Sequence, residues 1–346
     1  MIDFEHRDLR YDSGGRQLPH GLESARPSLR AGRKSMRTRR SARGTAADLI
    51  DLHALQRHLV SPMTSQPTNV FARAAPTYDA VGPRHFTYFA RKLVDFAAPQ
   101  PGSRVLDIAT GTGAVLLAAA ERLGGTGRVV GVDITEAMLN RAATEVRHRS
   151  LRGVELRTMD AHRLEFTNES FDYVLCSFGF LSLGDKRRAL DEFRRVLTTR
   201  GRVCLLDAYG WFFQHDSRWA RQEEVFRSFG ALSNREANPY GPGYLEGAIT
   251  TAGFEAVANR EDSCPLLFRD EEECWSWMWS HGSRALLETV DPAQLDNLKR
   301  TLFRGMDACR EADGMIHGTL RAVLVRGRKP LLAPALLSDN RPAHHR

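Results

Sequence analysis

The chain has 346 residues, 42% of them apolar, and carries a formal net charge of +7. It is therefore long enough for one large or two small domains with a packed core. No run of 18 apolar residues occurs and the N-terminus lacks a hydrophobic signal core, so we expect neither a membrane span nor secretion. The five cysteines include no close pair, which predicts no disulfide framework and no metal site, and the expected location is cytoplasmic.

The N-terminal segment, residues 1–62, holds most of the positive charge. It has 12 basic and 7 acidic residues and so carries +5, which leaves +2 for the remainder. Its Arg-, Ser- and Gly-rich composition predicts a disordered extension, either a solvated tail or a binding or targeting arm. An over-extended reading frame is a further interpretation. The nearly neutral remainder lacks the basic surface that phosphate binding needs, so nucleic acid is not an expected partner.

Strands and helices alternate from residue 104 to residue 206. Before them, a helix with Phe86, Phe89, Leu93 and Phe96 on one face is expected to cover the sheet. The alternation predicts an α/β fold with a doubly wound, Rossmann-like, mostly parallel seven-stranded sheet, whose ligand lies beyond the carboxyl ends of the strands. The predicted strands are 104–108, 128–133, 154–159, 173–176 and 203–206, and the predicted helices are 113–123, 136–148 and 186–197.

The pattern changes after Asp207, where we expect a helical lid and a helical insertion. Asp270 with Glu273, and Asp291 followed by Pro292, are start signals for two inserted helices. The predicted segments are a lid at 209–244, a helix at 244–252, a strand at 254–258, the insertion at 268–312, a last strand at 316–325 and a disordered tail at 331–346, so that the folded domain spans 63–330.

Residues 105–116 carry the strongest functional signal. A β-branched run, the carboxylate of Asp107, a turn with Gly111 and Gly113, and an apolar helix start together predict a nucleotide-binding turn. A dinucleotide fingerprint needs a third small residue where this chain has Leu116, so NAD is disfavoured. No lysine follows the glycines as it does in a phosphate-binding P-loop, which disfavours a polyphosphate.

This turn, followed by Asp133 at the end of the next predicted strand, resembles motif I and the acidic motif of class I S-adenosylmethionine-dependent methyltransferases. Residues 159–161 and 171–179 also match that family in order and type. The resemblance is closest to the ubiquinone and menaquinone biosynthesis branch and its small-molecule relatives, which share Ala109 in place of the superfamily's first glycine. It spans roughly residues 71–328 and implies S-adenosyl-L-methionine as the cofactor.

The resemblance also implies roles for single residues. Asp107 would oppose the α-ammonium of the methionine moiety, Asp133 would accept both ribose hydroxyls, and Asp160 would accept from the adenine amino group. Asp133 as a helix-start acid and Asp160 as a plain turn residue remain alternatives. The implied cofactor-binding residues are Asp107, Ala109, Thr110, Gly111, Gly113, Asp133, Ile134, Met138, Asp160, Ala161, Cys176 and Ser177.

The chain departs from the quinone branch after residue 179. Those enzymes follow Phe-Gly-Leu with an Arg-Asn pair, whereas this chain has Phe180, Leu181 and Ser182, so their quinone substrate is not implied. The chain also lacks the Asn/Asp-Pro-Pro-aromatic motif of many DNA and protein methyltransferases. We therefore expect a small-molecule methyltransferase of specialised metabolism, for which a homodimer is a possible assembly. The alternative is a protein of the same fold that binds the cofactor without transferring methyl, as a scaffold or cyclase.

Aromatic residues in the loops that should roof the cofactor predict a flat, apolar acceptor. His215 is the preferred general base over His281, although either histidine could instead lie at the surface or in the core, and Tyr78 is a third catalytic candidate. The tryptophans at 275–279 form either packing contacts or an aromatic substrate wall. The predicted substrate-contacting residues are Phe178, Phe180, Trp211, Phe212, Tyr240 and Tyr244.

Overall fold

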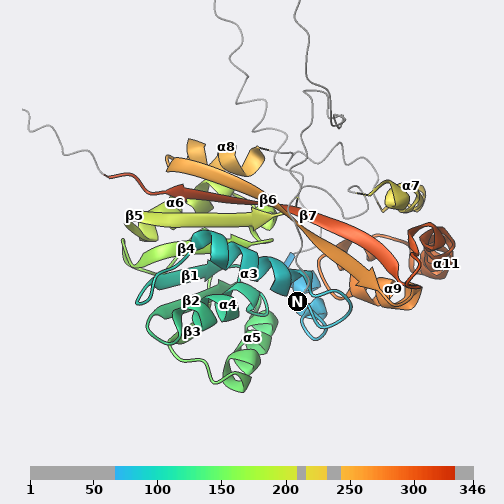
Figure 1. The fold of residues 1–346 in the computed structure, drawn as a ribbon, viewed down its shortest axis with the longest axis horizontal. Coiled ribbons are helices and arrows are strands. Elements are labelled where there is room, and N and C mark those ends of the chain that lie inside the picture. Colours follow the sequence, from blue (N-terminus) through green and yellow to red (C-terminus); the bar gives the residue numbers. More distant parts are fainter. Residues whose placement is uncertain (1–66, 209–215, 232–242, 332–346) are drawn as a thin grey trace, which may run out of the picture. The chain divides into compact units, whose positions relative to one another are not determined.

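One seven-stranded sheet organises the part of the chain that this computed structural model describes, residues 67–208, 216–231 and 243–331. The strand order is β3-β2-β1-β4-β5-β7-β6 (Figure 1). Strands β1 to β5 pair in parallel, and β7 runs antiparallel to both β5 and β6. The predicted mostly parallel, doubly wound sheet is confirmed. Its strands are β1 Arg104–Ile108, β2 Arg128–Asp133, β3 Val154–Thr158, β4 Phe171–Ser177, β5 Leu197–Asp207, β6 Glu255–Phe268 and β7 Ile316–Arg328.

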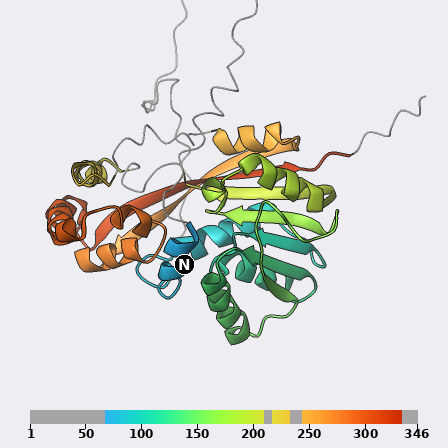
Figure 2. The same cartoon turned by 180° about the vertical axis from the view of Figure 1, so that it is seen from behind.

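Helices cover both faces of this sheet, because successive strand residues point to opposite faces and both sets are apolar. Val105 packs in the cluster under α3 and α4, whereas its neighbour Leu106 packs in the cluster under α6 and α8. Figures 1 and 2 show α3, α4 and α5 on one face and α6 and α8 on the other. These helices are α3 His85–Ala97, α4 Ala114–Leu123, α5 Glu136–His148, α6 Lys186–Val196 and α8 Tyr244–Thr251.

Strand β6 is much longer than the predicted strand at 254–258. It pairs with β7 from Glu255 opposite Arg328 to Phe268 opposite Ile316. Most of its first ten residues are charged or polar, and most of the ten are exposed, so they lack the apolar alternation by which a strand is recognised. Strands β4 and β5 also extend beyond their predicted ends.

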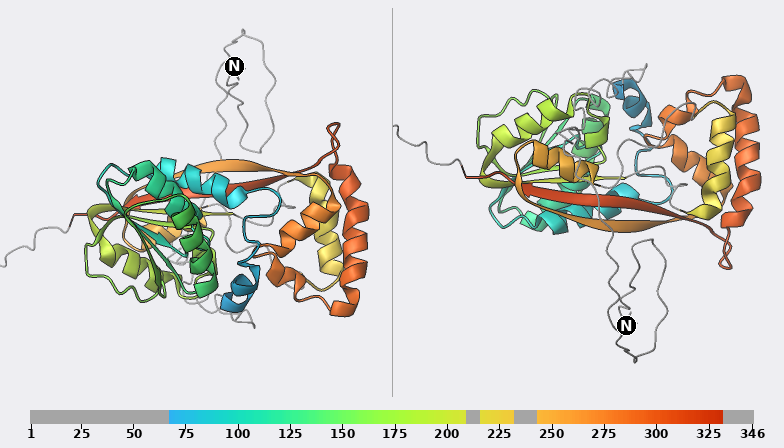
Figure 3. Two further views of the ribbon diagram at one scale, coloured as in Figure 1. Left: turned by 90° about the horizontal axis from the view of Figure 1, so that it is seen from below. Right: turned by 90° about the horizontal axis from the view of Figure 1, so that it is seen from above.

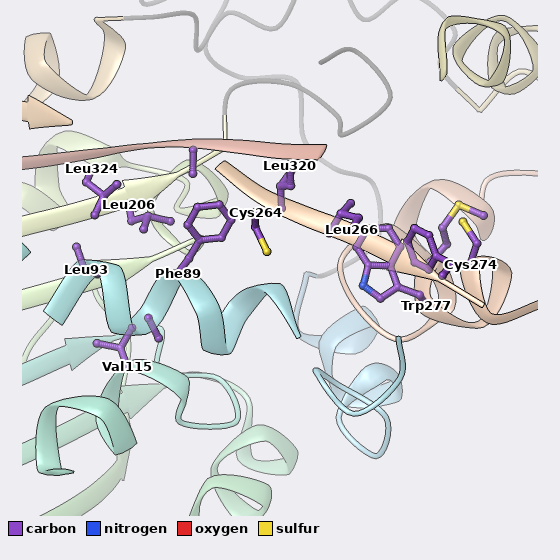
Figure 4. Close-up of a cluster of buried hydrophobic side chains, with 14 of the residues drawn as sticks. Phe89, Leu93, Val115, Leu206, Cys264, Leu266, Cys274, Trp277, Leu320 and Leu324 are labelled. Atoms are coloured by element: carbon purple, nitrogen blue, oxygen red, sulfur yellow. The ribbon is translucent and has the colours of Figure 1, made fainter. Parts of the chain in front are cut away.

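Short helices pack at the far end of the antiparallel β6–β7 pair (Figure 3). They are α7 Ala220–Ser228, α9 Glu271–Trp279, α10 Arg284–Leu287 and α11 Leu295–Met306, so the insertion contains three α-helices where two were predicted. Asp270 caps α9 by accepting from the Glu273 N–H at 2.8 Å, as predicted. Figure 4 shows how Cys264 and Leu266 of β6 connect Phe89 of α3 with Trp277 of α9, so a single apolar core runs from the sheet into the insertion.

Other features bear on the environment of the protein. All five cysteines are free and buried. Within the described ranges, no helix is both long enough and apolar enough to cross a membrane. The first described helix is α2, Pro67–Ala74, so the predicted extension at 1–62 and nearly all of the tail at 331–346 lie outside the described residues.

Candidate functional site

The turn between β1 and α4 lies at the switch point of the sheet, where β1 is flanked by β2 and β4. Its backbone is left-handed at Ala109, Gly111 and Gly113, with φ of 53°, 56° and 92°. A Cβ on Gly113 would lie 3.2 Å from the Cβ of Ala142, so this glycine also lets α4 and α5 approach closely. A Cβ on Gly111 would meet no atom within 4 Å, so the turn faces open space there.

The loop after β4 touches this turn. A Cβ on Gly179 would lie 2.6 Å from the Cβ of Ala109, which is too close for two non-bonded carbons. Phe178, in the same loop, has a left-handed φ of 56°. The two loops therefore meet at the edge where the ligand of such a sheet is expected.

Asp107 is a buried carboxylate at the base of the turn. Its Oδ2 accepts from the Thr110 hydroxyl at 2.6 Å and from the Leu116 N–H at 3.0 Å. Burial raises the pKa of Asp107 to about 7, in spite of these two hydrogen bonds. A cation placed beside Asp107 would therefore favour the ionised form of the carboxyl group.

Asp133 connects the end of β2 with the turn. Its Oδ2 accepts from the Gly111 N–H at 2.9 Å, and its Oδ1 accepts from the Thr135 N–H at 2.8 Å, where α5 begins. The hydrogen bond from Thr135 is expected if Asp133 is a helix-start acid. The hydrogen bond from Gly111 is not explained by that interpretation. Each oxygen keeps a lone pair, so the carboxylate can still accept from two hydroxyl groups.

A small cavity lies over the turn, and Tyr78 and Phe86 form its other wall. The Tyr78 and Phe86 rings stack with their centroids 4.7 Å apart. Burial, and after it the carboxylates of Asp79, Asp133 and Asp207, raise the pKa of the Tyr78 phenol. The cavity-lining residues are Tyr78, Phe86, Asp107, Ala109, Thr110, Gly111, Thr112, Ala114, Val115 and Ser177.

Next to this cavity is a cluster of rings, the histidine–aromatic cluster, formed by His85, Phe86, Phe178, Trp277 and His281. The His281 ring lies 4.3 Å from Trp277, 5.3 Å from His85 and 6.0 Å from Phe86. Phe178 lies 5.1 Å from Phe86 and 6.0 Å from His85. The cluster thus joins the loop after β4 to the inserted helices.

Asp207, at the end of β5, is a site feature that we did not predict. It is 7% exposed, and its two oxygens accept from the Leu181 N–H at 3.1 Å and from the Ala208 N–H at 3.0 Å. Burial raises its pKa to about 7. Its position in the sequence could have indicated this location, because Asp107, Asp133 and Asp207 all lie in or at the end of an apolar strand. His85 and Phe86 were also missed as site residues.

Other predicted cofactor residues surround the carboxyl ends of β2, β3 and β4. Ile134 is 56% exposed beside Asp133, an unusual position for a large apolar side chain. Asp160 is exposed, and its Oδ1 accepts from the N–H and the ring Nδ1 of His162 at 2.9 and 2.6 Å. The remaining predicted residues Met138, Ala161 and Cys176 are buried and do not line the cavity.

The predicted substrate and catalytic residues divide into three groups. Phe178 and His281 lie in the histidine–aromatic cluster, and Tyr78 lines the cavity. Phe180 is fully buried in the core between β4 and α6, and Tyr244, at the start of α8, packs against the same core cluster, so neither lines the cavity. Trp211, Phe212, His215 and Tyr240 lie outside the described residues.

Trp275 and Trp279 pack against each other at 6.0 Å, and Trp277 is buried in the core, where its ring contacts that of His281. In the described residues, no group of three or more His, Cys, Asp or Glu side chains could hold a metal ion.

Comparisons with known proteins identify related sequences. Residues 105–201 match the model of a methyltransferase domain. The chain is 32% identical over 272 residues to nocamycin O-methyltransferase of Saccharothrix syringae, a match that covers 75% of this chain and 97% of that protein. It is 40% identical over 144 residues to aklanonic acid methyltransferase DauC of Streptomyces sp. (strain C5), covering 42% of this chain and 66% of the relative. It is also 36% identical over 157 residues to the ubiquinone/menaquinone biosynthesis C-methyltransferase UbiE of Xanthomonas oryzae pv. oryzae, covering 43% and 60%.

Solved structures of low sequence identity are also similar. The YcgJ protein of Bacillus subtilis has a TM-score of 0.48 at 20% identity, and the match covers 72% of this chain and 100% of that one. Phosphoethanolamine N-methyltransferase 2 of Haemonchus contortus has a TM-score of 0.48 at 19% identity, and the match covers 79% and 61%.

Proposed function

Because the chain belongs to the class I S-adenosylmethionine-dependent methyltransferases, we propose that it transfers the cofactor's methyl group to a small, flat and mainly apolar acceptor of specialised metabolism. The observation that carries the proposal is the carboxylate of Asp133, which is fixed by backbone N–H groups of the turn and of α5 and still has a free lone pair on each oxygen.

The residues around the turn fit S-adenosylmethionine chemically. The α-ammonium of its methionine moiety needs an anion, which Asp107 would supply, and its ribose needs two hydrogen-bond acceptors, which Asp133 would supply. Exposed Ile134 offers an apolar face next to Asp133, as the adenine ring requires. Gly111 leaves the backbone open to close approach.

The cofactor supplies a methyl group bound to a sulfonium sulfur, and when an acceptor atom attacks the methyl carbon in line, the sulfur leaves as a neutral thioether. The protein contributes to the reaction by positioning the acceptor and the cofactor and by excluding water. Tyr78 and Phe86 would cover the cofactor on one side, and Phe178 would border the acceptor. The raised pKa of Tyr78 keeps its phenol protonated, which disfavours it as a base. A hydroxyl acceptor must still lose its proton, and His215 remains our preferred base.

The names of the relatives support a small-molecule acceptor. Nocamycin O-methyltransferase and aklanonic acid methyltransferase are named for small molecules, and the departure at Phe180–Ser182 separates this chain from the quinone branch. Because these relatives are methyltransferases, the alternative of a non-methylating scaffold or cyclase is disfavoured. Five free thiols fit a reducing compartment, so we place the activity in the cytoplasm.

The proposal can be tested with methyl-labelled S-adenosylmethionine and the full chain. Aklanonic acid and a panel of hydroxylated aromatic acids serve as acceptors, with a DNA fragment and a denatured protein mixture as comparison substrates. We expect label in a product that organic solvent extracts, and none in the macromolecules. Label only in macromolecules would overturn the small-molecule assignment.

A further inference from the structure

In the histidine–aromatic cluster, His85, Trp277 and His281 are buried, and three of their ring nitrogens have hydrogen-bond partners. The Trp277 Nε1–H donates to the Pro83 carbonyl at 3.3 Å. His85 Nδ1 also lies 3.3 Å from that carbonyl, and because a carbonyl only accepts, this nitrogen carries the proton. His281 Nδ1 accepts from the Ser283 N–H at 3.3 Å.

Nε2 of His281 has no such partner in the part of the chain that the structure describes. This atom is buried, and none of the described residues forms a hydrogen bond with it. The whole side chain is only 7% exposed. A buried polar group without a partner destabilises a fold, so Nε2 of His281 calls for a partner that a bound ligand can supply.

The hydrogen bond at Nδ1 of His281 determines whether Nε2 is a donor or an acceptor. A neutral imidazole has one N–H and one bare nitrogen. Because His281 Nδ1 is the acceptor for Ser283, the proton must be on Nε2, which is therefore a donor. Burial and the neighbouring His85 lower the pKa of His281 well below its ordinary value, so the ring stays neutral and keeps this tautomer at physiological pH.

His281 lies near the cavity over the turn. Its ring lies 6.0 Å from that of Phe86, which lines the cavity over the turn, and the cluster also contains Phe178. We infer that the Nε2–H of His281 donates to a carbonyl oxygen of the methyl acceptor, so that the enzyme selects planar acceptors with such an oxygen close to the methylated group. This inference rests on the proposed function and gives His281 the role of a specificity-determining donor rather than a base.

The experiment uses two planar probes that differ in their carbonyl groups, 1-hydroxyanthraquinone and 1-hydroxyanthracene. Binding of each to the full chain saturated with S-adenosylhomocysteine is measured by fluorescence. The variants are His281→Leu, which removes the donor, His281→Gln, which keeps an N–H, and His317→Leu as a matched control on β7, whose ring is paired with Asp313. Melting temperature and calorimetry with S-adenosylhomocysteine check each variant's fold and cofactor site.

We expect the quinone to bind more tightly than 1-hydroxyanthracene in the wild type. His281→Leu should weaken quinone binding roughly 5- to 100-fold, and His281→Gln should restore much of it. The weakening should be the same from pH 6 to pH 8, whereas loss of a base would depend on pH. Equal affinity for the two probes, no binding of the quinone, or the same loss in His281→Gln as in His281→Leu would overturn the inference. If cofactor binding is intact, these results leave the proposed methyl transfer unaffected.

Discussion

Three carboxylates define the site at the level of single residues. Asp107, Asp133 and Asp207 lie in or at the ends of β1, β2 and β5, and burial is the main cause that raises the pKa of each. Asp133 is fixed by two backbone N–H groups. The pKa of about 7 for Asp107 and Asp207 places their titration in the physiological range, and two predictions follow from it.

Cofactor binding should release a proton near neutral pH. A cationic α-ammonium beside Asp107 favours the ionised carboxylate, so binding lowers a pKa that starts at about 7. The affinity for S-adenosylmethionine should therefore rise between pH 5.5 and pH 7. Calorimetry in buffers of different ionisation enthalpy measures the released proton directly, and Asp107→Asn should abolish the release. An unchanged proton count in that variant would remove Asp107 from contact with the cofactor.

Asp207 should make the unliganded fold less stable as the pH rises. Its pKa is about 7 in the fold and 3.8 ordinarily, so the folded state holds the proton that the unfolded state has lost. The loss of stability that Asp207 causes is absent below both pKa values, and it grows as the pH rises from about 4 to about 7. Asp207→Asn cannot ionise, so its melting temperature should fall less than that of the wild type between pH 5 and pH 8. Parallel curves for the two proteins would contradict this assignment.

At the level of elements, the contact between the β1 and β4 loops requires one glycine. A Cβ on Gly179 would lie 2.6 Å from that of Ala109, and overpacking of this kind typically costs about 1–3 kcal/mol. Gly179→Ala should therefore lower the free energy of unfolding by that amount, and adding Ala109→Gly should recover part of the loss. Gly184→Ala is the control, because a Cβ there meets no atom within 4 Å. Chemical denaturation measures all four proteins, and equal losses at 179 and 184 would show that the loops do not touch.

The regular elements of the sheet could be predicted because their residues interact with near neighbours. The predicted ends of β1, β2 and α5 agree with the structure within one residue, since apolar periods, glycines and caps mark them. The full length of strand β6 could not be predicted from residues 254–258, because the rest of the strand is held by pairing with β7 rather than marked by an apolar pattern of its own. Leu197 was placed in the preceding helix although it begins β5.

For the whole molecule, the site combines segments that are far apart in sequence. The contact between His85 and His281 brings the helix before β1 against the insertion carried by the antiparallel β6–β7 pair. The conformation of the turn after β1 could be predicted, because a contiguous motif encodes it. The histidine–aromatic cluster depends on how the inserted helices pack, which no local pattern specifies, so His85 and Phe86 were missed, and Phe180 was expected beside the ligand although it is buried in the core.

Removal of residues 1–62 should leave folding and catalysis nearly unchanged. Residues 1–44 show no sustained apolar period and the segment carries 12 basic against 7 acidic residues, so we expect it to contribute little stability. A protein that starts at Met63 should keep its melting temperature and its affinity for S-adenosylhomocysteine. A large decrease in either would show that the extension covers the site or exchanges between subunits.

The central claim is that the turn and Asp133 bind the nucleoside of S-adenosylmethionine, and calorimetry with S-adenosylhomocysteine tests it most directly. We expect the wild type to bind the ligand in a 1:1 ratio. Asp133→Ala should weaken binding by about 1–3 kcal/mol, roughly one to two decades in Kd, because the ribose hydroxyls lose their charged acceptor. Glu136→Ala, in the first turn of α5, is the matched control and should bind as the wild type does. A wild type that does not bind, or an Asp133→Ala protein that binds as tightly as the wild type, would contradict the account.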